Sequence, residues 1–224
     1  MESSPTLVKN KTLGILLDGF LFLSMLVLGI LTIALNPVKL RIAFGVMSLT
    51  FAVGEGLHFA TRVFSFCGKD PAKCRALLGL GDLLISVFMT LGFLVFLFLD
   101  YYFYLSQNAF FFMTGCLVAC VRIIACCFSD NHWTKGPAPT FGVRRFRNIP
   151  MVLLMLLGFI NALIANFDDN LWLAPAGWFY LPIMIAILGY SAAVEFGPRN
   201  PKFYGGMGFL ALALLALAIL GLFL

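Results

Sequence analysis

Residues 44 to 66 read FGVMSLTFAVGEGLHFATRVFSF, an apolar segment long enough to cross a bilayer as a helix. Three ionisable side chains interrupt it. Glu55, His58 and Arg62 are spaced by three and then four residues, which places them on one face of the helix. Insertion scales assign an ionisable group in hydrocarbon a cost of about 2.5 to 3.5 kcal/mol, so such groups tend to face the protein interior and to serve function. This polar stripe is the leading candidate site in the sequence.

Composition assigns the whole chain to the membrane class. Of its 224 residues 62% are hydrophobic and only 11% are charged, with a mean hydropathy of +1.01. Soluble domains carry about a quarter charged residues. Apolar runs predict seven spans, over residues 12–35, 42–66, 76–104, 107–128, 149–167, 171–196 and 203–224. The expected fold is all-α: a polytopic membrane protein in which residues 1–224 form a single domain, one bundle of seven transmembrane helices.

The loop charges predict the orientation. Eleven of the fifteen lysines and arginines fall on the side of the N-terminus. The opposite side has Lys39 and Arg41, together with the acidic pair Asp168 and Asp169. The positive-inside rule then places the N-terminus in the cytoplasm and the C-terminus outside the cell membrane. The net charge of +5 is on this interpretation a topology signal, so the expected partner is the lipid bilayer and not a nucleic acid.

Polar residues inside the spans fall at a shared depth. Asp18, Asp82 and Arg122 each lie about six residues, roughly 9 Å, from the cytoplasmic end of their spans. His58 lies about 12 Å in, and Glu55 lies near the midplane. These depths predict a hydrated cavity that opens to the cytoplasm and is lined by spans two, three, four and six. The candidate substrate or proton site comprises Glu55, His58, Arg62, Asp82, Ser86, Arg122 and Glu195, with Asp18, Arg147, Asn148 and Ser191 as further contributors.

Metal and cofactor chemistry finds little support in the sequence. Glu-x-x-His is half of a ferritin-like di-iron motif, but that site needs a second copy and two more glutamates. The chain has only Glu2, Glu55 and Glu195. Two histidines, His58 and His132, are too few for a three-histidine zinc site. We therefore expect no metal ion and no cofactor.

Three functions are compatible with the polar layer. The leading hypothesis is a carrier or channel for a small polar or ionic solute, proton-coupled through Glu55, His58 and Asp82. The first alternative is an intramembrane hydrolase acting on a lipid headgroup, with Asp82 and either His58 or Glu55 in acid and base roles. The second is a non-catalytic accessory subunit whose charges only pack. The apolar outer half of the spans favours the enzyme over the carrier, and the sequence leaves the oligomeric state open.

A faint internal repeat favours transport. Glu55 and Arg62 near the end of the second span correspond to Glu195 and Arg199 near the end of the sixth. The third and seventh spans then open with Gly-x-Gly, at residues 79–81 and 206–208. A 3+1+3 parallel pseudo-repeat of this kind is the architecture of SWEET-type sugar transporters. The proline-glutamine motif of relatives of that family is missing.

Four spaced motifs resemble those of a known family. They are Gly54-Glu55-x-x-His58-x-x-x-Arg62, Leu78-Gly79-x-Gly81 with Ser86-x-x-Met89-Thr90, Asn131-x-Trp133, and Arg147-Asn148-Ile149-Pro150. Together they cover spans two to five, about half of the chain. They are similar to motifs of an uncharacterised family of small bacterial seven-span membrane proteins. The resemblance implies no activity, but it marks Glu55, His58, Arg62, Arg147 and Asn148.

The last of these motifs also predicts a helix start. Asn148 is a good N-cap, and proline is tolerated in the first turn of a helix, so span five is expected to begin at Asn148. Pro182, inside span six, is expected to kink its helix.

Overall fold

The computed structural model describes residues 5–35, 38–103, 109–134, 141–168, 185 and 201–223. Over these ranges all regular secondary structure is helical. The elements are α1 (Pro5–Leu35), α2 (Lys39–Cys67), α3 (Pro71–Phe103), α4 (Ala109–Cys127), the short 3-10 helix η1 (Ser129–Asn131), α5 (Phe141–Asp168) and α7 (Pro201–Phe223). Predicted span six lies outside the described residues apart from Ile185, and so do Ser191, Glu195 and Pro182.

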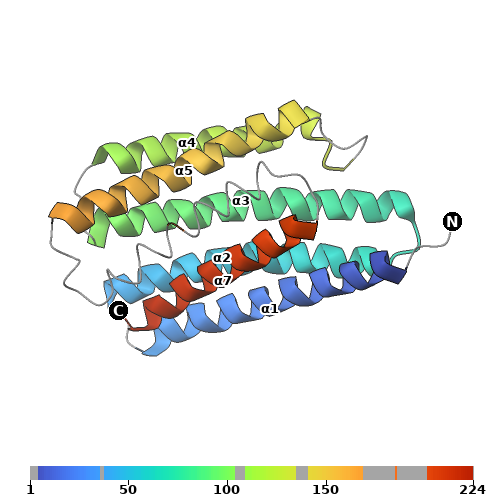
Figure 1. The fold of residues 1–224 in the computed structure, drawn as a ribbon, viewed down its shortest axis with the longest axis horizontal. Coiled ribbons are helices and arrows are strands. Elements are labelled where there is room, and N and C mark those ends of the chain that lie inside the picture. Colours follow the sequence, from blue (N-terminus) through green and yellow to red (C-terminus); the bar gives the residue numbers. More distant parts are fainter. Residues whose placement is uncertain are drawn as a thin grey trace.

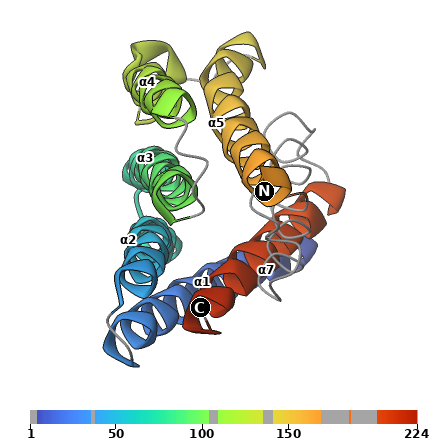
Figure 2. The same ribbon diagram turned by 90° about the vertical axis from the view of Figure 1, so that its left-hand side faces the viewer.

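The long helices lie side by side along the longest axis of the molecule (Figure 1). Seen from the end, α1, α2, α3 and α4 follow one another in a row (Figure 2). Helix α2 therefore packs between α1 and α3, its two main neighbours. Helix α5 packs back onto α3 and α4, while α7 packs on α1 and α2. The polar stripe of α2 therefore has α1 on one side and α3 on the other.

Among the described residues, four helices are long and apolar enough to cross a membrane, over Gly14–Leu35, Lys39–Cys67, Pro71–Leu99 and Ala109–Cys127. Of these four segments Lys39–Cys67 is the least apolar. Large apolar side chains point outward from α1 and α4, among them Leu16, Phe20, Met113 and Leu117. Outward-facing apolar side chains of this kind are compatible with contact to lipid acyl chains. The all-helical, membrane-compatible architecture predicted from composition is confirmed at this level.

Glycines bring α1 and α2 into close contact. A Cβ atom on Gly29 would lie 3.1 Å from the Gly45 carbonyl oxygen, and one on Gly45 would lie 2.9 Å from the Gly29 carbonyl oxygen. Small residues allow the backbones of membrane helices to approach in this way. Close to this contact in sequence, Met25 of α1 and Phe44 and Met47 of α2 belong to the buried apolar core.

Helix α3 begins with a defined cap. Asp70 Oδ1 accepts hydrogen bonds from the backbone N–H groups of Ala72 (2.9 Å) and Lys73 (3.4 Å), and Pro71 occupies the first helical position. The α2–α3 turn lies at the same end of the bundle as the starts of α1 and α5 and the end of α4 (Figure 1). The described segments that border three of the cation-containing parts of the sequence therefore share one end, called the cation-rich end. The loop that contains Arg199 lies outside the described residues.

The predicted start of span five, residue 149, is wrong by eight residues. Helix α5 begins at Phe141, so Asn148 and Pro150 lie inside it. Pro150 has no N–H to donate to the Phe146 carbonyl. The helix continues past this gap because Arg147 and Asn148 are buried and held by side-chain hydrogen bonds, which no N-cap rule takes into account.

Candidate functional site

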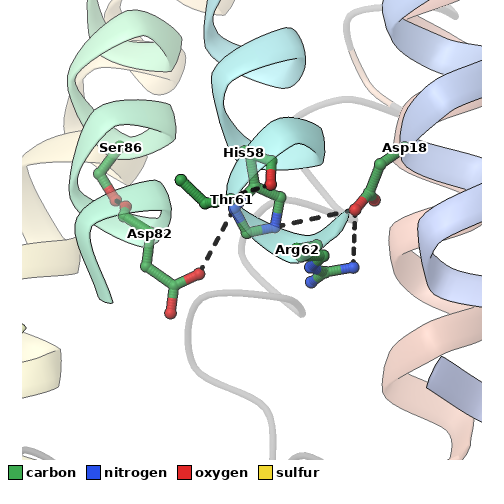
Figure 3. A network of polar contacts seen from close by, with 6 residues as sticks. All are labelled: Asp18, His58, Thr61, Arg62, Asp82 and Ser86. Carbon is green, nitrogen blue, oxygen red and sulfur yellow. Dashed lines mark hydrogen bonds and ion pairs between the residues drawn. The ribbon is translucent and has the colours of Figure 1, made fainter. Parts of the chain in front are cut away.

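His58 lies at the centre of a polar cluster built from three helices (Figure 3). Its side chain is 5% exposed and lies between Asp18 of α1 and Asp82 of α3 (Figure 3). Nε2 is 3.9 Å from Asp18 Oδ2, and Nδ1 is 3.6 Å from Asp82 Oδ1. Both distances exceed that of a direct hydrogen bond but lie within ion-pair range. Each ring nitrogen thus faces one carboxylate.

Arg62 lies one turn after His58 on α2 and binds the same aspartate. Its Nη1 is 2.8 Å from Asp18 Oδ2, the distance of a charge-assisted contact. Gly14 leaves room for the guanidinium, because a Cβ at this position would approach Arg62 Nη1 to 3.2 Å. Asp18 therefore has a cation beside it whatever the charge of His58. We refer to Asp18, His58, Arg62 and Asp82 as the His58 cluster.

Helices α2 and α3 come together at this level because residue 81 is glycine. A Cβ on Gly81 would overlap the Thr61 hydroxyl and lie 3.3 Å from His58 Nδ1. The Thr61 hydroxyl in turn donates to the His58 carbonyl oxygen at 2.8 Å. The second glycine of the Gly-x-Gly motif thus sets the distance between His58 and the helix that carries Asp82.

The remaining predicted site residues differ in their surroundings. Glu55 is 5% exposed and lies one turn before His58, while Arg122 is 2% exposed on α4. The hydroxyls of Ser86 and Thr90, which follow Asp82 at intervals of four residues on α3, are bonded within their own helix. Ser86 Oγ donates to the Asp82 carbonyl and Thr90 Oγ1 to the Ser86 carbonyl, both at 2.7 Å. Both hydroxyl protons are therefore already donated within α3, which leaves these groups less available to a solute.

Arg147 and Asn148 belong to a second cluster, at the end of α4. Asn131 Nδ2 donates to the Ala125 carbonyl at 2.7 Å, and Trp133 Nε1 donates to the Cys126 carbonyl at 2.7 Å. These bonds satisfy carbonyls that the last turn of a helix leaves without partners. Arg147 donates from Nη1 to Asn131 Oδ1 at 3.4 Å, and its Cζ lies 4.5 Å from the centre of the Trp133 ring. We call Asn131, Trp133, Arg147 and Asn148 the α4 cap cluster.

Helix α3 touches both clusters through the two glycines of one motif. Gly79 lies against the Trp133 carbonyl, which a side chain at this position would overlap, while Gly81 lies against Thr61 and His58. Three of the four motifs noted in the sequence supply the α4 cap cluster and its contact with α3. Asn131, Trp133 and Thr61 were not among the predicted site residues. The motif spacing was the signal for the first two, and nothing in the sequence distinguishes Thr61.

Two open surface pockets lie near the cation-rich end. One of about 330 Å³ is lined by Phe128, Asp130, Asn131 and Phe146, among others, and one of about 380 Å³ by Lys73, Leu77, Leu80 and Thr134. Neither is lined by the His58 cluster. Within the described ranges no group of three or more histidine, cysteine, aspartate or glutamate side chains is placed to hold a metal ion. The side chains of the His58 cluster can bind and release a proton and can form ion pairs with one another.

Comparison with known proteins gives no match to a family model, a curated protein or a solved structure. The resemblance drawn from the four motifs stays a prediction.

Proposed function

We propose that this protein is a seven-span membrane carrier or channel for a small polar or ionic solute, in which His58 binds a proton. The observation that carries the proposal is the position of a buried imidazole between two carboxylates from the two neighbouring helices. Buried ionisable groups within membrane spans mark solute and proton pathways. An imidazole is the side chain whose charge changes most readily near neutral pH.

Protonation of His58 would change how three helices attract one another. With a neutral imidazole the four groups of the His58 cluster carry two negative charges and one positive charge. With an imidazolium the charges balance. The added attraction acts between α1, α2 and α3 at low local dielectric, where charge pairs interact more strongly than in water. Such a change in attraction is a means of coupling proton binding to movement of the bundle.

The proposed topology has seven crossings, with the N-terminus in the cytoplasm and the C-terminus outside the cell membrane. Helices α5 and α7 run in the same direction (Figure 1), which favours one further crossing between them. The apolar run 171–196 is long enough, at about 1.5 Å per residue, to supply it. The 3+1+3 pseudo-repeat and the contributions of Ser191 and Glu195 remain part of this proposal.

Proton flux tests the role of His58. We expect purified protein in liposomes to carry protons, followed with trapped pyranine, at a rate that depends on pH between about 5.5 and 8. His58→Gln keeps hydrogen-bonding capacity but cannot titrate, so the pH dependence should disappear. The matched control is His132→Asn, which removes the other histidine at an exposed position with φ of 50° that asparagine tolerates. An unchanged pH profile in His58→Gln would refute the proposal.

A lipid-headgroup hydrolase is the second candidate, because the Asp82 carboxylate is partly exposed beside the buried His58. In that case Asp82→Asn should abolish hydrolysis of phospholipid vesicles, followed by mass spectrometry of the products, while proton flux stays at the level of empty liposomes.

A further inference from the structure

We propose that Asp82 carries protons between water at the cation-rich end of the bundle and His58, and that the Asp18–Arg62 pair holds the imidazole ready to accept them. The inference rests on the proton-binding role of His58 in the proposed function. It adds the direction of proton movement: protons reach His58 from Asp82 on α3, and the carboxylate that faces the imidazole on its other side is Asp18 on α1.

Exposure distinguishes the two carboxylates. The Asp82 side chain is 45% exposed, whereas those of Asp18 and His58 are 14% and 5% exposed. Of the two carboxylates, Asp82 is therefore the one that can be reached from outside the bundle. The Asp82 Oδ1–His58 Nδ1 distance of 3.6 Å must shorten by roughly 0.8 Å for transfer, to the length of a charge-assisted hydrogen bond. A partly exposed aspartate side chain has the rotational freedom for this movement.

The Asp18–Arg62 contact orients the imidazole. Arg62 Nη1 lies 2.8 Å from Asp18 Oδ2, the same oxygen that faces His58 Nε2 at 3.9 Å. A carboxylate paired with guanidinium accepts hydrogen bonds and donates none. When Asp82 is protonated, its O–H can donate to Nδ1, and we infer that neutral His58 in this state carries its own proton on Nε2, toward Asp18. The hydrogen-bond partner of one ring nitrogen commonly selects the tautomer in this way.

The step is a simple proton relay. A hydronium ion gives a proton to the Asp82 carboxylate and becomes water. The Asp82 O–H bond then breaks as the His58 Nδ1–H bond forms, which leaves a carboxylate beside an imidazolium. The other ionisable groups that α1, α2 and α3 bring to this level are Asp18, Arg62 and Glu55. The described side chains of α7, residues 211–223, include no ionisable group.

The tautomer can be measured with residue 82 held in a proton-donating form. In Asp82→Asn the side-chain amide stands in for the protonated carboxyl group. Nitrogen-15 NMR of this variant in liposomes at about pH 8, with the His58 signals identified by their loss on adding His58→Gln, should show the proton on Nε2. A proton on Nδ1 would overturn the proposal.

The rate of His58 protonation tests the path. After a light-triggered drop in pH, time-resolved infrared spectra should show His58 protonated at least about tenfold more slowly in Asp82→Asn than in the wild type. Asp82→Glu restores a carboxyl group and should recover most of the rate. Thr50→Ala, which removes an exposed hydroxyl that is bonded within α2 and lies outside the His58 cluster, is the control and should change the rate less than about twofold. Wild-type kinetics in Asp82→Asn would refute the path.

These measurements use no solute, so they separate the path from the proposed function. Wild-type kinetics in Asp82→Asn together with a pH-dependent proton flux that needs His58 would overturn only the path. A proton flux that does not need His58 would overturn the proposed function.

Discussion

At the scale of single residues, Arg62 balances the charge of the buried Asp18. The Asp18 side chain is 14% exposed and lies 2.8 Å from the guanidinium, with His58 on its other side. Without Arg62, the carboxylate would keep only the 3.9 Å contact with an imidazole that is charged when protonated. The ion pair therefore stabilises both the fold and the charge state on which the His58 cluster depends.

A double-mutant cycle measures this pair. Removing one partner of a fully buried pair costs about 3–5 kcal/mol, and exposed pairs contribute below about 1 kcal/mol. Because the Arg62 side chain is 31% exposed, we expect Arg62→Gln to lower the free energy of unfolding by about 1–3 kcal/mol. Adding Asp18→Asn should recover part of the loss, with a coupling energy above about 0.5 kcal/mol. Chemical unfolding in detergent provides the values, and additive effects would show that the two residues act independently.

At the scale of helices, the end of α4 depends on side-chain donors from the segment that follows it. Asn131 Nδ2 lies within hydrogen-bonding distance of the carbonyls of Ala125, Cys126 and Phe128, at 2.7, 3.3 and 3.1 Å. Asn131 is 1% exposed, so water would not replace these bonds. The same residue accepts from Arg147, which joins the end of α4 to α5.

Asn131→Asp tests this cap, because it replaces the amide donor by an oxygen of nearly the same size. The carbonyls would then face a carboxylate, and we expect a loss of about 1–3 kcal/mol in the free energy of unfolding. Ser129→Ala is the control, since the Ser129 hydroxyl contacts only the exposed Asp130 carboxylate among the bonds described for it. Equal stability of Asn131→Asp and the wild type would show that the cap contributes nothing.

Helix α3 can contact the α4 cap cluster only because residue 79 is a glycine, which has no side chain. Gly79→Ala would drive a methyl group into the Trp133 carbonyl, so we expect a loss of about 1–3 kcal/mol and altered near-ultraviolet circular dichroism from Trp133. Gly142→Ala is the matched control, because a Cβ there meets nothing within 4 Å. A stability change in Gly142→Ala as large as that in Gly79→Ala would indicate a general loss of glycine flexibility instead.

At the scale of the whole molecule, the distribution of cations predicts which side faces the cytoplasm. A cysteine placed at Gly136 should stay unlabelled by an impermeant maleimide in intact cells, whereas a cysteine at Asp169 should be labelled. The background carries serine at the exposed native cysteines Cys67, Cys120 and Cys127. Labelling at 136 and not at 169 would reverse the orientation. Permeabilised cells, in which both positions should react, are the control.

The sequence was sufficient for features that depend on composition and spacing. The described helix boundaries fall within seven residues of the predicted spans except at the start of α5, where tertiary contacts of Arg147 and Asn148 override the N-cap preference of asparagine. The placement of Glu55, His58 and Arg62 on one helix face followed from their spacing. The pairing of Arg62 with Asp18 did not, because it depends on which helix lies beside α2.

Spacing also could not separate Arg147 and Asn148 from the His58 cluster. Both were expected to contribute to one site because they belong to one of the four motifs on which the family resemblance rests. In the structure they close the end of α4 together with Asn131 and Trp133. That arrangement requires the turn after α4, whose geometry includes His132 with a positive φ.

The polar face of α2 also has a consequence for biogenesis. Its segment is the least apolar of the four candidate spans, and its charged groups find their counterparts on α1, made before it, and on α3, made after it. A nascent α2 would therefore gain little by leaving the translocation channel for lipid on its own. With Asp18 already present and the Gly29–Gly45 contact available, α1 would remain beside the channel until α2 joins it. The first three helices would then enter the bilayer as a group and not one by one.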